Sequence, residues 1–267
     1  MTAFADGAPC WVDAMFPDIG AAKEFYGELL GWTFDEGSPE FGGYTQAHSN
    51  GKAVAAVVPQ LPEMAGQPAA WNFYFASSDV AATAERITAN GGKLLMEPMA
   101  VGEFGTMVTA QDPSGVHFSV WQAGQHEGFA KTGEPGSFCW AEVFTRDAAA
   151  ADAFFPAVFD FGVKRIVDDA MDFRLWEVDG QPVMGRFKMT DDVPAEAPSY
   201  ISVYFGVEDC DEAVATVQRL GGRLYFGPMT MAFGRFAVVA DPQGAAFAVI
   251  DTATTEGEPP QLADPES

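Results

Sequence analysis

The sequence contains the same pattern twice. The segment Trp11-Val12-Asp13 returns as Trp140-Ala141-Glu142, and the turn tetrapeptide Asp112-Pro-Ser-Gly115 returns as Asp241-Pro-Gln-Gly244. The second pair is separated by 129 residues (241 − 112). A repeat this long predicts two copies of one domain, not a solenoid of short repeats. Functional residues are therefore expected at equivalent positions in the two copies.

Composition indicates a soluble, globular protein with two domains of ordinary size. The chain has 267 residues, of which 48% are hydrophobic and 13% aromatic, and no apolar run approaches the ~18 residues of a membrane span. Residues 1–9 lack the basic and apolar stretches of an export signal. Cys10, Cys139 and Cys210 have no metal-like spacing and are expected as buried free thiols. These features predict a cytoplasmic protein.

Charge restricts the partners. The formal net charge is −24, from 38 acidic against 14 basic residues. Because nucleic-acid binding depends on Lys and Arg that displace counterions, this balance excludes nucleic acid and anionic membrane as primary partners. We expect a small hydrophobic or aromatic molecule as the partner, and a monomer or weak dimer.

Each copy divides into two strand–helix–strands units. In the first unit a strand over 11–16 precedes a helix that Asp18 caps and Gly31 ends. Asn50-Gly51 marks a hairpin, and Asp179-Gly180 repeats that signal in the second copy. The other expected helices cover 79–89, 148–158 and 210–220.

The same pass along the chain predicts the domain boundaries. The repeated domains are expected at 9–122 and 138–251. A polar, Gly-rich linker over 123–137 joins them, and an acidic, disordered tail over 252–267 follows them.

This order of elements resembles the vicinal oxygen chelate superfamily, which includes glyoxalase I, bleomycin-resistance proteins and extradiol dioxygenases. The phrase Ala22-Lys-Glu-Phe-Tyr-Gly-Glu-Leu-Leu-Gly-Trp32 is similar to that superfamily's helix-and-turn signature, and the tandem arrangement looks most like two-domain actinobacterial proteins of glyoxalase or hydroxylase type. The resemblance implies an α+β fold of two tandem domains. Each would be built of two β-α-β-β-β units that curl an eight-stranded sheet around a cleft.

Strand alternation predicts which side chains face each cleft. Val12, Ala14 and Phe16 are expected to pack on the helix, so that the intervening residues point the other way. The cleft-facing set in the first copy is Trp11, Asp13, Met15, Asn72, Tyr74 and Ala76, and in the second copy it is Trp140, Glu142, Phe144, Ser202, Tyr204 and Gly206.

The resemblance also implies where metal ligands would stand. In metal-using relatives one ligand lies seven residues before each helix-capping Asp, and another lies seven residues after the Asp of Asp-Pro-x-Gly. These positions hold Trp11, Asn72 and Ser119 in the first copy and Trp140, Ser202 and Ala248 in the second. Indole and methyl groups offer no donor to a first-row metal. We therefore expect no metal and no other cofactor. His117, which shares the parity of Ser119, is retained as a candidate catalytic residue.

Three functions remain open. The first is metal-independent binding of a small hydrophobic or aromatic metabolite, with the Trp and Tyr side chains as an aromatic surface. The second is a metal-free enzyme of secondary metabolism (an isomerase, cyclase, lyase or hydroxylase-like protein) that uses Asp13 or Glu142, paired with Tyr74 or Tyr204, as general base. The third is a scaffold whose clefts are filled. Typical glyoxalase I or extradiol dioxygenase activity is disfavoured.

Overall fold

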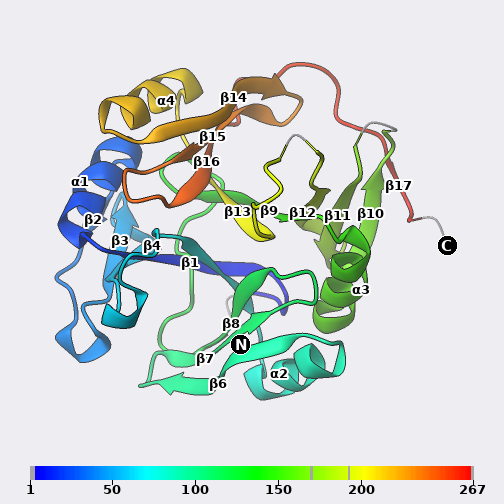
Figure 1. The fold of residues 1–267 in the computed structure, drawn as a ribbon, viewed down its shortest axis with the longest axis horizontal. Coiled ribbons are helices and arrows are strands. Elements are labelled where there is room, and N and C mark those ends of the chain that lie inside the picture. Colours follow the sequence, from blue (N-terminus) through cyan, green and yellow to red (C-terminus); the bar gives the residue numbers. More distant parts are fainter. Residues whose placement is uncertain (1–3, 169–170, 192, 266–267) are drawn as a thin grey trace.

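The computed structural model describes residues 4–168, 171–191 and 193–265 as two curled sheets with two pairs of helices at their sides (Figure 1). The first domain contains strands β1 (Pro9–Phe16), β2 (Thr33–Phe34), β3 (Thr45–Ser49), β4 (Lys52–Pro59), β5 (Trp71–Ala76), β6 (Lys93–Val101), β7 (Gly105–Gln111) and β8 (His117–Ala123). Its helices are α1 (Ile19–Leu30) and α2 (Val80–Ala89), with short 3₁₀ turns at Pro39–Phe41 and Pro62–Met64.

The second domain repeats this set. Its strands are β9 (Phe138–Thr145), β10 (Gly162–Ile166), β11 (Phe173–Val178), β12 (Gln181–Lys188), β13 (Tyr200–Gly206), β14 (Arg223–Met231), β15 (Gly234–Ala240) and β16 (Ala246–Asp251), and its helices are α3 (Ala148–Phe159) and α4 (Cys210–Arg219). One further strand, β17 (Leu262–Ala263), lies near the C-terminus.

The two sheets have the same strand order. The first runs β2-β3-β4-β1-β5-β8-β7-β6, and the second runs β10-β11-β12-β9-β13-β16-β15-β14, with β17 added outside β10. Register repeats as well, because Trp11 lies opposite Tyr74 as Trp140 lies opposite Tyr204. The predicted α+β fold of two tandem domains is confirmed.

The local signals act as expected. The side chains of Asp18, Asp79, Asp147 and Asp209 each cap a helix by accepting a backbone N–H three residues later. The hairpin between β3 and β4 turns through Asn50 and Gly51, which both have positive φ angles of 52° and 76°. These caps and turns fix where each strand begins, and thereby which of its residues face the helices.

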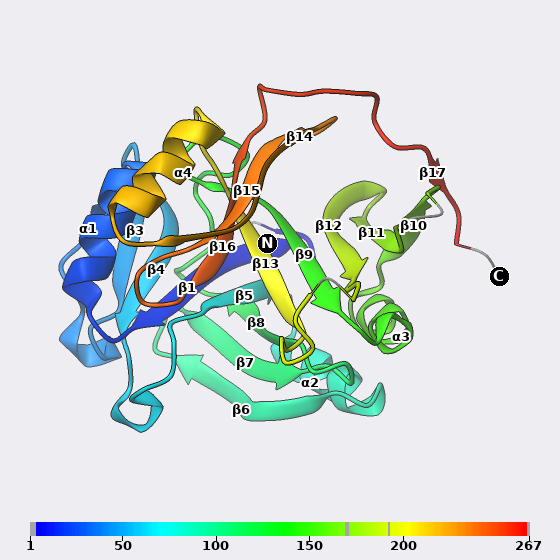
Figure 2. The ribbon, with the colours of Figure 1, turned by 45° about the horizontal axis from the view of Figure 1, so that its top comes forward.

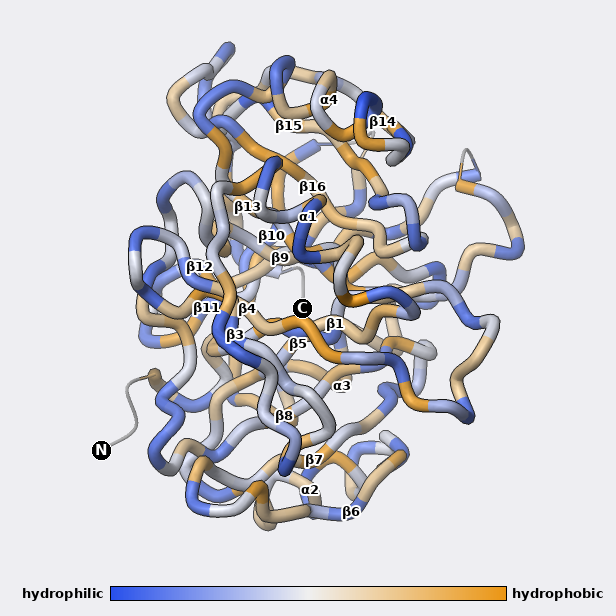
Figure 3. The backbone as a smooth tube through the Cα atoms, turned by 90° about the vertical axis from the view of Figure 1, so that its left-hand side faces the viewer, coloured by the Kyte–Doolittle hydropathy of each residue, from blue (hydrophilic) through white to orange (hydrophobic). Residues whose placement is uncertain are grey.

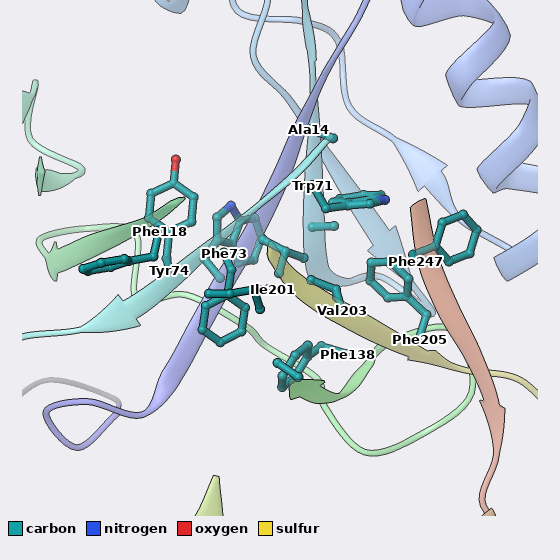
Figure 4. Close-up of a cluster of buried hydrophobic side chains, with 14 of the residues drawn as sticks. Ala14, Trp71, Phe73, Tyr74, Phe118, Phe138, Ile201, Val203, Phe205 and Phe247 are labelled. Carbon is teal, nitrogen blue, oxygen red and sulfur yellow. The ribbon is translucent and has the colours of Figure 1, made fainter. Parts of the chain in front are cut away.

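The helices of the two domains pack against each other, α1 on α4 and α2 on α3. Phe75 stacks on Phe159 with ring centroids 4.4 Å apart, and Trp71 meets Phe205 at 5.0 Å. One continuous hydrophobic core therefore runs through both domains (Figure 4). Hydropathy along the chain follows this arrangement, with hydrophobic stretches concentrated in the strands and hydrophilic ones in the turns (Figure 3). On the face opposite the helices, Trp11 and Tyr74 of the first domain still belong to this core, whereas Tyr204 of the second domain belongs to a separate small cluster.

The linker is attached to both domains. Gly124 N–H donates to Phe104 O, Phe129 N–H donates to Cys10 O, and Gly136 N–H donates to Gly206 O, at 2.8–2.9 Å. Within the part of the chain that is described, no helix has the length and apolarity needed to cross a membrane.

The expectation for the tail needs a correction. Residues 252–265 are described, and β17 within them pairs antiparallel with β10. The low hydrophobicity of this segment indicated disorder, but the unpaired edge of β10 offers backbone partners that composition does not reveal.

The hydroxyl of Tyr26 joins the two domains. It donates to Oδ2 of the buried Asp241 at 3.0 Å and accepts from Trp71 Nε1 at 3.2 Å. We expect Tyr26→Phe to lower the free energy of unfolding by about 1–2 kcal/mol, because a buried carboxylate loses a donor. Urea denaturation measures this. Tyr225→Phe, whose side chain is exposed, is the matched control and should change nothing. Equal stability of the two variants would contradict a role for this contact.

Candidate functional site

The first domain carries a buried carboxylate at its centre. Asp13 lies on β1, where its Oδ2 accepts from Tyr74 Oη at 2.8 Å and from Tyr44 Oη at 3.5 Å. Its Oδ1 accepts from Asn72 Nδ2 at 3.3 Å. Trp11 Nε1 in turn donates to Tyr44 Oη at 2.7 Å. Asp13 is thus held by three donors from β5 and from the residue preceding β3.

Aromatic side chains cover this carboxylate. Trp11 is 2% exposed and Asp13 is 8% exposed. His126 and Phe129 of the linker pack on Trp11, with ring centroids at 4.4 Å and 5.5 Å. These contacts fill the space in front of Trp11, so the first domain offers little free surface at this position.

The rim of the first domain is closed by a further ring contact. Phe41, just before β3, meets Phe104 of the β6–β7 turn at 5.3 Å. These two rings come from the opposite ends of the eight-stranded order. Together with the linker they make the first domain a closed structure.

Burial shifts the ionisation of these groups. The pKa of Asp13 rises to about 6, because burial disfavours its charged form and the hydrogen bonds from Tyr74, Asn72 and Tyr44 only partly compensate. Burial also lowers the pKa of His126 to about 4. His126 is therefore neutral at physiological pH.

The second domain has the same arrangement with fewer donors. Glu142 lies on β9, where Tyr204 Oη donates to Oε2 at 2.9 Å and Trp140 Nε1 donates to Oε1 at 3.2 Å. Phe173 occupies the position equivalent to Tyr44 (173 − 44 = 129), and it has no hydroxyl to offer. The two oxygens of Glu142 therefore keep acceptor capacity that a ligand could use.

Gly185 makes room for this arrangement. It lies opposite Glu142 in the register of β12 with β9. A Cβ at Gly185 would meet Phe173 Cζ at 2.3 Å and Glu142 Cγ at 3.1 Å. The Phe173 ring therefore lies directly over Gly185, beside the carboxylate.

Glu142 lies in a band of aromatic side chains that five strands contribute, β9, β12, β13, β14 and β15. Phe144 stacks on Tyr200 at 5.1 Å with a 3° interplanar angle, and it meets Phe187 at 5.2 Å. On the other side Tyr204 contacts Phe236 at 6.1 Å, and Phe236 contacts the exposed Phe226 at 5.9 Å. This aromatic face consists of Trp140, Phe144, Phe187, Tyr200, Tyr204, Phe226 and Phe236.

The aromatic face is more open than its counterpart. Trp140, Glu142, Phe144 and Tyr200 are only half-buried, whereas Trp11 and Asp13 are buried. Tyr204 and the adjoining Phe236 belong to a small hydrophobic cluster separate from the shared core. The second domain therefore presents aromatic surface that the core does not need.

The carboxyl group of the aromatic face, Glu142, has a pKa near neutrality. Burial raises the pKa of Glu142 to about 7, against the lowering effect of the hydrogen bonds from Tyr204 and Trp140. Burial and the nearby Glu142 charge raise the pKa of Tyr200 to about 12. Glu142 can therefore hold or release a proton at physiological pH, while the tyrosines stay protonated.

The structure brings together most of the predicted site residues. The expected pairs Asp13–Tyr74 and Glu142–Tyr204 both form, and Ser119 extends the first network by donating to Asn72 Oδ1 at 3.1 Å. Ser202 is buried opposite Glu142.

Two predicted residues lie outside the networks. Met15 is half-buried beside Val58, and its thioether has no part in the hydrogen bonds described for Asp13. His117 is exposed at the start of β8 and contacts Gln111 Nε2 at 2.8 Å, so the structure places it apart from Asp13.

Sequence reasoning missed several members of both sites. Alternation along β13 and β15 carries a signal for Tyr200 and Phe236, whereas Tyr44 lies just before β3. His126 comes from the linker, where no periodicity exists to place it.

The donor chemistry does not fit a divalent metal. Trp11 Nε1 and the Asn72 amide are already engaged with Tyr44, Asp13 and Ser119, and neither is a good metal ligand. No group of three or more His, Cys, Asp or Glu side chains suited to an ion occurs among the described residues.

A separate hollow of about 220 Å³ lies beside the aromatic face. It is lined by Arg165, Ile166, Asp168, Met171, Asp172, Phe173 and Arg174. Phe173 lines this hollow and also flanks Glu142, so the two regions share one wall. Most of the lining is charged, and the volume is below that of typical pockets for drug-sized ligands.

Comparisons with known proteins agree with this fold. Residues 11–120 and 137–249 both match the Glyoxalase/Bleomycin resistance protein/Dioxygenase superfamily. The chain belongs to this superfamily and carries two of its domains in tandem.

One relative is similar over nearly its whole length. The anthracycline biosynthesis protein DnrV of Streptomyces peucetius is 38% identical over 269 residues, which cover 94% of this chain and 95% of DnrV.

Solved structures support the fold alone. A Mn(II)-bound glyoxalase from Novosphingobium aromaticivorans superposes with a TM-score of 0.64 at 16% identity, over 94% of this chain and 86% of the other. The 2,3-dioxygenase LapB from Pseudomonas sp. KL28 gives 0.65 at 14% identity, over 97% and 95%.

The raised pKa of Glu142 predicts a pH-dependent stability. The folded protein keeps this proton up to about pH 7, whereas the unfolded chain releases it near the ordinary pKa of 4.5. The stabilisation is full below the unfolded pKa and is lost as pH rises through about 7, by on the order of 2–3 kcal/mol. Urea denaturation between pH 5 and 8 should show this fall. Because Asp13 loses its own stabilisation as the pH rises to about 6, Glu142→Gln should abolish only the part of the fall above pH 6, and Asp13→Asn, the control, should retain that part. A fall above pH 6 that persists in Glu142→Gln would refute the assignment.

The donor set also predicts the metal content. Purified protein should contain well under one equivalent of Zn, Fe, Ni or Mn, because neither domain offers three competent ligands. Elemental analysis after dialysis measures this. One equivalent of metal that remains bound after dialysis would contradict the prediction that neither domain holds a metal.

Proposed function

We propose that the protein binds a planar aromatic metabolite on the aromatic face of its second domain, without a metal. The observation that carries this proposal is the half-buried Trp140 and Glu142 within a band of rings outside the shared core. An aromatic platform beside a carboxylate with spare acceptor capacity suits a flat molecule that bears a hydroxyl or another hydrogen-bond donor.

The energetics are sufficient for binding. Covering ~200 Å² of apolar ligand surface contributes roughly 5 kcal/mol before association costs. Stacking on Trp140 and a hydrogen bond to Glu142 would add to this. An affinity in the micromolar range is expected.

The first domain acts as the scaffold in this proposal. Trp11, covered by His126 and Phe129, has no free face, and Asp13 is already held by three donors. Its helices pack against those of the second domain and hold the sheet that carries Glu142.

The similarity to DnrV supports the class of ligand. That relative is named for the biosynthesis of anthracyclines, which are fused-ring aromatic compounds, and the match covers both chains almost completely. A role in secondary metabolism, with a polycyclic aromatic compound as the bound molecule, is consistent with the aromatic face.

A second candidate function is proton transfer by Glu142. Its pKa of about 7 and its two donors, Tyr204 and Trp140, would allow it to act as a general base toward an acidic C–H or O–H of the bound ring system. Glu142→Gln separates the two candidates, because binding would survive this change and proton exchange on the ligand would not.

Replacing Trp140 tests the binding proposal. Titration with 1,4-dihydroxyanthraquinone, a planar hydroxylated probe, should change tryptophan fluorescence. Trp140→Ala should weaken binding by roughly 1–3 kcal/mol, because it removes the aromatic platform. Trp11→Ala, the equivalent change in the first domain, should leave the affinity within a factor of about two.

Trp140→Phe provides a check on folding, because it keeps a ring and should retain most of the affinity. Equal affinities for Trp140→Ala and the unchanged protein, both folded by circular dichroism, would contradict the proposal.

A further inference from the structure

We propose that residues 252–265 form a releasable strap that closes the aromatic face of the second domain and controls how fast a ligand enters and leaves. This inference rests on the proposed function for its biological meaning. Its structural basis is the path of the C-terminal segment, which is independent of any ligand.

The strap connects the two opposite ends of the second sheet. After β16 ends at Asp251, the backbone N–H of Glu256 donates to Met231 O at the end of β14, at 3.0 Å. Farther along, Gln261 O accepts from Val167 N–H at 2.9 Å, and β17 pairs with β10. β14 and β10 are the first and eighth strands of the spatial order. Figure 2 shows the segment arching from the β14 side to the β10 side.

The strands between these two ends carry the candidate site. Trp140 and Glu142 are on β9 and Tyr204 is on β13, in the middle of the same order. Because the sheet is curled and its helices cover the other face, a chain that joins its two ends passes on the side of the aromatic face. The strap therefore completes a ring of backbone around that side.

The first domain closes in a different way. There Phe41 and Phe104 come from the two ends of the sheet and touch directly. The equivalent of Phe104 is Phe233 (233 − 104 = 129), and its side chain is 49% exposed. The two ends of the second sheet are thus joined by the backbone strap, whereas the two ends of the first sheet are joined by the contact between Phe41 and Phe104.

The attachment to β10 is weak enough to open. It includes a two-residue pairing, Ile166 with Leu262 and Arg165 with Ala263, the backbone hydrogen bond from Val167 to Gln261, and an ion pair between Lys164 and Asp264. Asp264 is 82% exposed, and such surface ion pairs contribute little to stability. The strap lacks a buried apolar anchor at this end, because Leu262 is itself 43% exposed. Segments with few buried contacts open at low free-energy cost.

Two full-length variants test the strap. The variant Ala263→Pro/Asp264→Lys removes a backbone donor from β17 and places a lysine opposite Lys164, so it should release the strap. The variant Ile166→Cys/Leu262→Cys places a disulfide between register partners, so it should lock the strap when oxidised. Glu258→Lys is the matched control, because it makes the same change in charge as Asp264→Lys at an exposed position in the middle of the strap.

Stopped-flow mixing with 1,4-dihydroxyanthraquinone measures association and dissociation rates. Both rates should rise about tenfold in the released variant and fall about tenfold in the oxidised locked variant, with recovery on reduction. Glu258→Lys should match the unchanged protein. Identical rates in the released, locked and unchanged proteins would overturn the strap while leaving the binding proposal intact.

Acrylamide quenching of Trp140 fluorescence tests the strap without any ligand, with Trp140→Phe used to subtract the other tryptophans. The released variant should show at least about twofold stronger quenching of the Trp140 signal than the locked one. If the probe does not bind to the unchanged protein, the proposed function is wrong, and the quenching experiment alone tests the strap. Equal quenching of Trp140 in the released and locked variants would then overturn the strap proposal.

Discussion

A carboxylate near the middle of each sheet requires hydrogen-bond donors, and this requirement organises both domains. Removing an ionised carboxyl group from water is costly unless neighbouring groups replace the lost hydration. The register of the two central strands supplies the donors, because it places Tyr74 next to Asp13 and Tyr204 next to Glu142. The tyrosine–carboxylate pair is therefore the feature that the repeated architecture preserves on the face opposite the helices.

The two copies differ in how completely this requirement is met. Asp13 has three donors and lies under Trp11 and the linker rings, so the first domain is closed. Glu142 has two, because Phe173 takes the place of the Tyr44 hydroxyl. One missing hydroxyl thus leaves the second carboxylate with acceptor capacity, and burial raises its pKa to about 7. The carboxylate of the first copy is thus enclosed, whereas that of the second copy lies on a more open aromatic face.

Much of the fold could be predicted from the sequence because its signals are local. The capping aspartates, the Asn50-Gly51 turn and the alternation of Val12, Ala14 and Phe16 each act within a few residues. Alternation also placed Asp13 and Glu142 on the correct face.

What was missed depends on contacts between distant segments. Tyr44 reaches Asp13 across 31 residues of chain, and His126 reaches Trp11 from a linker without periodicity. The pairing of β17 with β10 depends on an open strand edge that composition does not encode. The exposure of Trp140, compared with the burial of Trp11, follows from these same long-range contacts and not from the repeated motif.

A crystal structure of the protein soaked with 1,4-dihydroxyanthraquinone tests the central claim most directly. The account predicts density for a flat ring system stacked on Trp140, with a hydroxyl within hydrogen-bond distance of Glu142 and nothing at Trp11. Ordered ligand against Trp11 and Asp13, or an aromatic face that stays empty at saturating probe, would contradict it.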